Sequence, residues 1–192
     1  GAAGACVEAV GPGAALAAAD TAGGVGRYEA SLPTAFDCPV VLVDAAIYLV
    51  GSDSEPTGFD PSKDVQTAVF LKNYVDETSN VTTSSVLCAY VEDALNNNVW
   101  VELEGVAMTD TNWYDLRIEV DYNAATPVAR YYVGGVLLDA KGEAATTEFQ
   151  IANNSLFLSE ANQKVSSVSF RGTGAVDNFV GKTYAEVQTW AS

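Results

Sequence analysis

Residues 113–122 read Trp-Tyr-Asp-Leu-Arg-Ile-Glu-Val-Asp-Tyr, and this stretch decides the fold class. Apolar Leu116, Ile118 and Val120 alternate in it with charged Arg117 and Glu119. A period of two places the two kinds of side chain on opposite faces of a β-strand. The pattern predicts a strand with one face in a core and the other in solvent.

The segments on either side of this stretch repeat the pattern. Tyr131 and Val133 alternate with Arg130 and Tyr132, and the next residues, Gly134-Gly135, are typical of a tight hairpin turn. Short β-rich segments separated by turn residues continue from residue 27 onward, as in an antiparallel sandwich. We therefore expect an all-β, antiparallel jelly-roll sandwich with almost no helix. The predicted strands are 27–32, 39–50, 65–73, 84–92, 98–106, 113–122, 128–134, 136–139, 146–151, 155–158, 164–171 and 175–181.

The length of 192 residues suits one sandwich domain with short appendages. Residues 1–26 are rich in Gly and Ala, residues 27–182 carry the strand pattern, and residues 183–192 form a tail. For residues 1–26 the composition leaves two readings open. One is a linker or short exposed helix. The other is an extended arm that pairs with a sheet edge of its own chain or of a neighbouring copy.

The composition excludes several function classes. Asp and Glu number 25 against 9 Lys and Arg, which gives a net charge of −16. Such a surface repels polyanions, so nucleic acid and anionic membranes are poor partners. The chain has no His, which removes Ser-His-Asp triads and His-ligated zinc sites.

Three cysteines, Cys6, Cys38 and Cys88, lack the spacing of a metal knuckle or a redox motif. Either Cys6 and Cys38 form a disulfide in an oxidising compartment, or all three are buried thiols. The longest apolar run, residues 40–50, is interrupted by Asp44 and is too short to span a bilayer, so no transmembrane segment is expected.

Three motifs resemble a known superfamily. They are W-x-x-L-R-I-x-V-D at residues 113–121, the aromatic strand with a Gly turn at 130–135, and VSSVSFRGTGAVDNFV at 165–180. In this order they resemble the closing half of laminin-G-like jelly rolls of the concanavalin-A-like lectin and glucanase superfamily, and the resemblance covers residues 36–182. It implies a jelly-roll fold. Members of this superfamily include carbohydrate-binding modules, lectins, glycoside hydrolases and adhesion domains, so the fold alone does not determine the function.

The hydrolase branch, which resembles laminarinases, carries E-x-D-x-x-E with a nucleophile and a general acid. The nearest string here begins at Glu119 and Asp121 but has Ala124 in place of the last carboxylate. On this basis Glu119 and Asp121 are predicted to be non-catalytic. We expect no enzyme activity and assign no catalytic residue.

A sugar-binding platform is predicted on the outward faces of three consecutive strands. Sugars pack their C–H faces on aromatic rings, and their hydroxyls bind carboxylate and guanidinium groups. The alternative is that the charged residues form cross-strand ion pairs while the Trp packs under a loop. A further aromatic residue, Trp113, is expected in the core. The predicted carbohydrate-binding residues are Trp100, Glu102, Arg117, Glu119, Arg130 and Tyr132.

The loop at residues 51–64 carries four carboxylates among Gly and Pro: Asp53, Glu55, Asp60 and Asp64. Carboxylate oxygens are the ligands that calcium prefers, so these residues are the candidate ligands of a structural Ca²⁺. The alternative is a plain acidic loop.

Together these patterns predict a non-catalytic, extracellular carbohydrate-binding module that recognises a polysaccharide through one sheet face. The alternative is a structural or adhesive subunit of a cell-surface layer or filament, in which the N-terminal arm associates with a neighbouring copy.

Overall fold

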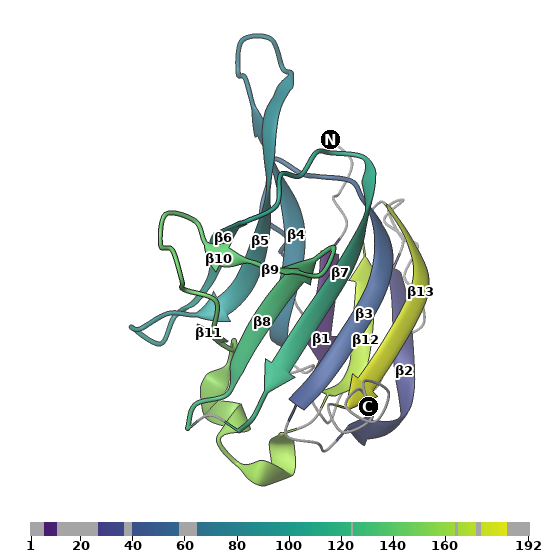
Figure 1. Cartoon of the computed structure of the whole chain (residues 1–192), viewed down its shortest axis with the longest axis vertical. Helices are drawn as coiled ribbons and strands as arrows, with labels where there is room; N and C mark the ends of the chain where they lie inside the picture. The colour runs from purple at the N-terminus through teal and green to yellow at the C-terminus, as the bar shows by residue number, and fades with distance from the viewer. Residues whose placement is uncertain are drawn as a thin grey trace.

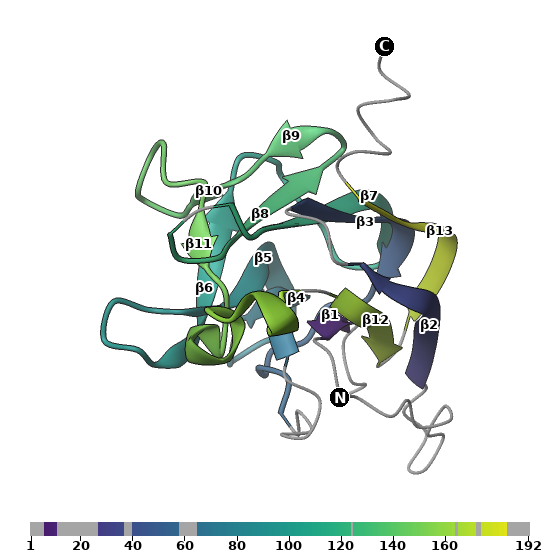
Figure 2. The same ribbon diagram turned by 90° about the horizontal axis from the view of Figure 1, so that it is seen from below.

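The computed structural model describes residues 6–10, 27–36, 40–57, 65–123, 125–163, 165–171 and 174–183. Two antiparallel sheets pack face to face as a sandwich, which confirms the all-β fold class (Figure 1). Figure 2 separates the layers, with β8, β7 and β3 above β4, β1 and β12. Among the described residues, no helix is long and apolar enough to cross a membrane.

The two sheets have seven and six strands. In spatial order, the first contains β10 (Asp139–Ala140), β6 (Asn98–Glu104), β5 (Thr82–Glu92), β4 (Val65–Val75), β1 (Cys6–Val10), β12 (Val165–Arg171) and β2 (Arg27–Phe36). The second contains β11 (Phe149–Gln150), β8 (Val128–Val133), β7 (Asn112–Asp121), β3 (Val40–Leu49) and β13 (Gly174–Thr183), with β9 (Val136–Leu137) paired to β8. Two 3-10 helices, η3 (Asn154–Phe157) and η4 (Glu160–Asn162), lie at one end of the sandwich.

The period-two alternation of β7 sets which face enters the core. Leu116, Ile118 and Val120 are buried between the sheets, whereas Arg117 and Glu119 lie on the outer face. Strand β8 follows the same rule because its buried residue Tyr131 pairs with Ile118. The predicted phase of these two strands is therefore confirmed.

Two buried tyrosines join the sheets through hydrogen bonds. The hydroxyls of Tyr131 and Thr67 lie 2.5 Å apart, and the Tyr122 hydroxyl donates to Gln66 Oε1 at 2.5 Å. Burial raises the pKa of both tyrosines, so both stay protonated. These bonds satisfy polar groups that would otherwise destabilise the core.

Some predicted elements differ from the structure. For Cys6–Val10 the sequence leaves open a linker, a short exposed helix or an arm that pairs with a sheet edge, whereas the structure has a strand in the interior of the seven-stranded sheet. Residues 155–158, predicted as a strand, fall largely in η3, where Asn153 adopts a left-handed φ of 54° and Phe157 turns into the core. Residues 184–192 of the tail lie outside the described residues.

Candidate functional site

The six predicted sugar-binding residues lie on two different sheets. Arg117, Glu119, Arg130 and Tyr132 share the outer face of the six-stranded sheet, on β7 and β8. Trp100 and Glu102 lie on β6, in the opposite sheet. The six do not form one platform, because the chain crosses from one sheet to the other between β6 and β7.

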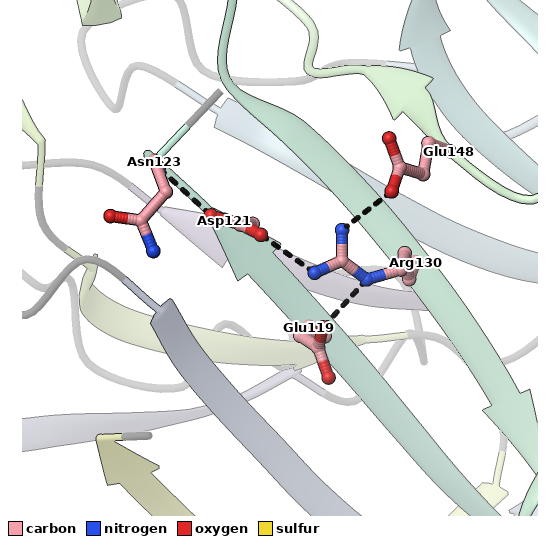
Figure 3. Close-up of polar contacts among 5 residues, drawn as sticks. All are labelled: Glu119, Asp121, Asn123, Arg130 and Glu148. Carbon is pink, nitrogen blue, oxygen red and sulfur yellow. Dashed lines mark hydrogen bonds and ion pairs between the residues drawn. The ribbon is translucent and has the colours of Figure 1, made fainter. Parts of the chain in front are cut away.

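Arg130 is the centre of an ion-pair network on the outer face of β7 and β8 (Figure 3). Its Nε donates to Glu119 at 2.6 Å, its Nη2 to Asp121 at 2.7 Å and its Nη1 to Glu148 at 3.2 Å. Burial acts to lower the pKa of Arg130, but the hydrogen bonds to Asp121 and Glu119 outweigh it and raise the pKa overall. Arg130 and Glu119 thus match the cross-strand ion-pair interpretation.

A second ion pair lies further along β7. Arg117 donates through Nε and Nη2 to the two carboxylate oxygens of Asp44 on β3, at 2.8 and 3.1 Å. The centre of this guanidinium lies 6.0 Å from the ring centre of Tyr132. The hydrogen bonds to Asp44 raise the pKa of Arg117, which keeps its charge. The same two bonds hold the guanidinium in one orientation.

These groups border a shallow pocket of about 370 Å³ on the outer face of the sheet. Asp115, from the same strand as Arg117, is exposed at this pocket. The lining comprises Asp44, Ala45, Ala46, Asp115, Leu116, Arg117, Tyr132 and Gly135.

An aromatic pair of exposed Trp113 and half-buried Tyr48 lies near this pocket on the same face. Trp113 and Tyr48 are register partners on β7 and β3, with ring centres 5.7 Å apart and planes tilted by 54°. Trp113 is 52% exposed, so its prediction as a core residue was wrong. The alternation along β7 could have predicted this exposure, because Trp113 has the same phase as Asp115 and Arg117 on the outer face.

We call this surface the β7 face. It comprises Asp44, Tyr48, Trp113, Asp115, Arg117 and Tyr132.

Trp100 and Glu102 have different surroundings. The half-buried Trp100 ring packs edge-on against fully buried Phe70, with ring centres 4.9 Å apart, and lies 5.1 Å from Tyr90. Glu102 accepts a hydrogen bond from the Tyr74 hydroxyl. It also pairs with Lys72 at 3.8 Å and with Lys141 at 3.6 Å. The hydrogen bond from Tyr74 is the main cause that lowers the pKa of Glu102.

The proposed calcium ligands are only partly described. Asp53 and Glu55 are exposed in the segment after β3, whereas Asp60 and Asp64 lie outside the described residues. Within the part of the chain that the structure describes, no three His, Cys, Asp or Glu side chains come together as a metal site.

Cys88 is a buried free thiol whose pKa is raised by burial to about 12. It is therefore protonated at neutral pH and a poor nucleophile. Cys38 and the side chain of Cys6 lie outside what the structure describes.

No protein-family model matches this chain, and no curated protein does. Solved structures with a similar fold include a polysaccharide lyase of family 18, aly-SJ02, with a TM-score of 0.40 and 12% identity. An alginate lyase from Alteromonas sp. 272 gives 0.39 and 10%, and in both pairs the match covers 79% of this chain and 60% of the lyase. A sialidase gives 0.36 and 12%, covering 83% of this chain and 14% of the other.

These comparisons correct the sequence-based function. Two of the similar structures are named as lyases, which contradicts the prediction of a non-catalytic module, its alternative of a structural or adhesive subunit, and the prediction of no enzyme activity. The missing hydrolase carboxylate argues only against hydrolysis and does not extend to lyases. Neither a family model nor these structures support the laminin-G assignment, and the fold that the structure shows is an antiparallel β-sandwich.

Proposed function

We propose that this chain acts on a polysaccharide and that the β7 face holds the sugar chain. The observation that carries the proposal is the exposed Trp113 beside Tyr48, on the same face as Asp115 and Arg117. Sugar rings pack their C–H faces on aromatic rings, while carboxylate and guanidinium groups bind the hydroxyls. The β7 face offers both kinds of contact side by side.

The arrangement of the charged groups supports this use. Arg117 is held by both oxygens of Asp44, so a sugar that binds there orders no additional side chain at that point. The pocket of about 370 Å³ falls in the usual size range of small-ligand sites. The outward residues of β7 from Trp113 to Arg117 extend over roughly 14 Å, which gives room for more than one sugar unit.

The neighbouring ion-pair network of Arg130 holds the strands that carry the β7 face in place. Three carboxylates already occupy the Arg130 guanidinium, and the second Asp121 oxygen accepts the backbone N–H of Asn123 at 2.8 Å (Figure 3). These groups fix the register of β7 against β8. We therefore assign sugar contact to Trp113, Asp115, Arg117 and Tyr132, and a structural role to Arg130 and Glu119.

Two expectations from the sequence accompany the proposal. We infer an extracellular setting, secreted or at the cell surface, because a polysaccharide-acting protein with a net charge of −16 suits it. We also propose a structural Ca²⁺ at Asp53, Glu55, Asp60 and Asp64, supported by the oxygen-rich composition of that loop.

Affinity electrophoresis on a panel of neutral and acidic polysaccharides tests the proposal, together with an assay for new chain ends. Trp113→Ala removes the exposed ring and should weaken retention, or slow cleavage, by about tenfold or more, as loss of an aromatic anchor does. Tyr74→Ala is the matched control, since Tyr74 is also a partly exposed aromatic residue but lies on the other sheet.

Two results would contradict the proposal. Loss of activity in Tyr74→Ala with none in Trp113→Ala would place the site on the seven-stranded sheet. If the wild-type protein neither binds nor cleaves any polysaccharide of the panel, the proposed function is wrong.

A further inference from the structure

The sequence contains two triplets of the form Asn-x-Ser/Thr without Pro in the middle, Asn80-Val81-Thr82 and Asn153-Asn154-Ser155. Such a triplet is the acceptor of N-linked glycosylation in secreted proteins, where the amide nitrogen of the Asn side chain receives the glycan. A bulky glycan needs an exposed position and an amide nitrogen that the fold does not use. The structure separates the two triplets on both counts.

Asn80 lies at the tip of the hairpin that joins β4 to β5. Figure 1 shows this hairpin projecting beyond the two sheets. Asn80 and Thr82 are exposed, and Val81 between them is 58% exposed. Within the described residues the Asn80 amide nitrogen donates no hydrogen bond, and neither does the Thr82 hydroxyl. Both groups that define the triplet are therefore accessible.

The turn before Asn80 is fixed by the side chain of Asp76. One carboxylate oxygen of Asp76 accepts the backbone N–H groups of Ser79 and Thr78, at 2.8 and 2.9 Å, and the Ser79 hydroxyl at 3.1 Å. These bonds, above all the one from the Ser79 N–H, lower the pKa of Asp76, which stays ionised at neutral pH. Asn80 follows with a left-handed φ of 58°, and its N–H donates to the Asp76 carbonyl at 2.7 Å. The fold thus holds the backbone of Asn80 and leaves its side chain in solvent.

The second triplet is used by the fold itself. Asn153 Nδ2 donates to the Val65 carbonyl at 2.8 Å, and Asn153 Oδ1 accepts a hydrogen bond from Asn98 at 2.8 Å. The backbone N–H of Asn153 donates to Asn98 Oδ1 at 3.0 Å, and Val65 is only 5% exposed. A glycan on this nitrogen would have to break the contact that ties the segment before η3 to β4. Asn153 is therefore incompatible with a glycan in the folded chain.

We propose that Asn80 is a site of N-linked glycosylation. In the transfer, Asn80 Nδ2 bonds to the anomeric carbon of an oligosaccharide, and the bond from that carbon to a polyprenyl diphosphate donor breaks. The amide gives up one proton and the lipid diphosphate leaves. The Thr82 hydroxyl marks Asn80 as the acceptor for the transferring enzyme. The proposal rests on the extracellular setting proposed above and is independent of the β7 face.

A glycan at this tip would cover a poorly protected part of the molecule. β6 pairs with β5 over Cys88–Glu92, and a bridge from Ser85 to Met108 continues on the same side. In the described part of the chain, residues 82–84 of β5 therefore form an open strand edge beside the exposed Val81. An open edge with an apolar neighbour favours pairing with other chains, and a bulky polar glycan blocks that approach.

Secretion of the full chain from cultured eukaryotic cells, behind a signal peptide, tests the proposal by peptide mass spectrometry before and after enzymatic removal of N-glycans. We expect the secreted wild type to carry one glycan, on Asn80. Asn80→Gln and Thr82→Ala should each lose the whole glycan mass, whereas Thr82→Ser keeps the triplet and should keep the glycan. Thr83→Ala is the matched control, because it removes the neighbouring exposed hydroxyl outside the triplet and should leave the glycan in place.

Two results would overturn the proposal. One is secreted wild-type protein without a glycan, even if affinity electrophoresis shows that this protein binds polysaccharide. The other is a glycan that remains in Asn80→Gln, since it would lie on the other triplet, at Asn153. A glycan on Asn80 in a protein that binds no polysaccharide would support this proposal and contradict only the role of the β7 face.

Discussion

Arg130 shows how one side chain can be fixed rather than reactive. Its guanidinium meets Glu119, Asp121 and Glu148, and its side chain is only 16% exposed. Glu119 and Asp121 are similarly enclosed, whereas Glu148 is 58% exposed. Removal of the cation would leave the two largely buried carboxylates of Glu119 and Asp121 side by side without a positive charge.

Arg130→Ala should therefore lower the free energy of unfolding by about 2–3 kcal/mol, as measured by urea denaturation. Glu148→Gln is the control, because an exposed ion pair contributes less than about 1 kcal/mol. Equal effects of the two substitutions would show that the network does not stabilise the fold.

Glu102 permits a prediction about pH at the same scale. Its pKa is lowered in the folded state, mainly by the hydrogen bond from Tyr74. A lowered folded pKa gives stability that is present above the unfolded pKa and is lost as the pH falls through the folded value. Between neutral pH and pH about 3, the melting temperature of Glu102→Gln should therefore fall less than that of the wild type. The difference should be small because the site is partly exposed. An unchanged fall would show that Glu102 does not contribute.

Strand β7 contains both the core and the proposed site, in alternate residues. Ile118 is 1% exposed and Trp113 is 52% exposed, so the two have opposite roles on one element. Ile118→Ala should lower the free energy of unfolding by about 2–5 kcal/mol through the cavity it leaves. Trp113→Ala should change it by much less, as a substitution at an exposed position. Thermal unfolding of both variants checks the difference. A large loss of stability in Trp113→Ala would show that Trp113 packs in the core.

The strands that the sequence predicted well are those with clear alternation. In β7 and β8 successive residues alternate between the core and the outer face, from Leu116 to Val120 and from Ala129 to Val133. β1 was not among the predicted strands and was only left open as an edge-pairing arm, because five residues within a Gly- and Ala-rich segment carry too short a pattern. Its pairing depends on β4 and β12, which are distant in the chain.

The proposed site was predicted only in part for a related reason. Local alternation gives the face of a strand but not the sheet to which the strand belongs, so Trp100 on β6 was grouped with residues of β7 and β8. Arg117 and Tyr132 were found because their strands do pair. Asp44 and Tyr48 were missed because the pairing of β3 with β7 spans more than sixty residues of chain.

At the scale of the whole molecule, the excess of acidic groups has a consequence for stability. A net charge of −16 destabilises the compact state through self-repulsion. Calcium bound at the loop of Asp53 and Glu55 would relieve part of this repulsion and favour the native state by mass action. The melting temperature should rise when millimolar calcium replaces chelator, and magnesium at equal concentration separates specific binding from general screening. An unchanged melting temperature would remove calcium from the account.

The sandwich as a whole presents two outer faces, each with a tryptophan, and the proposed polysaccharide site lies on only one of them. Trp113 lies on the outer face of the six-stranded sheet and Trp100 on that of the seven-stranded sheet. Nuclear magnetic resonance of the indole N–H groups during titration with an oligosaccharide distinguishes the two directly. The chain has a third tryptophan, Trp190, so Trp113→Phe and Trp100→Phe are both used to assign the signals. We expect the Trp113 signal to shift in a saturable way while the Trp100 signal stays in place. A saturable shift of Trp100 with Trp113 unchanged would contradict the proposed site.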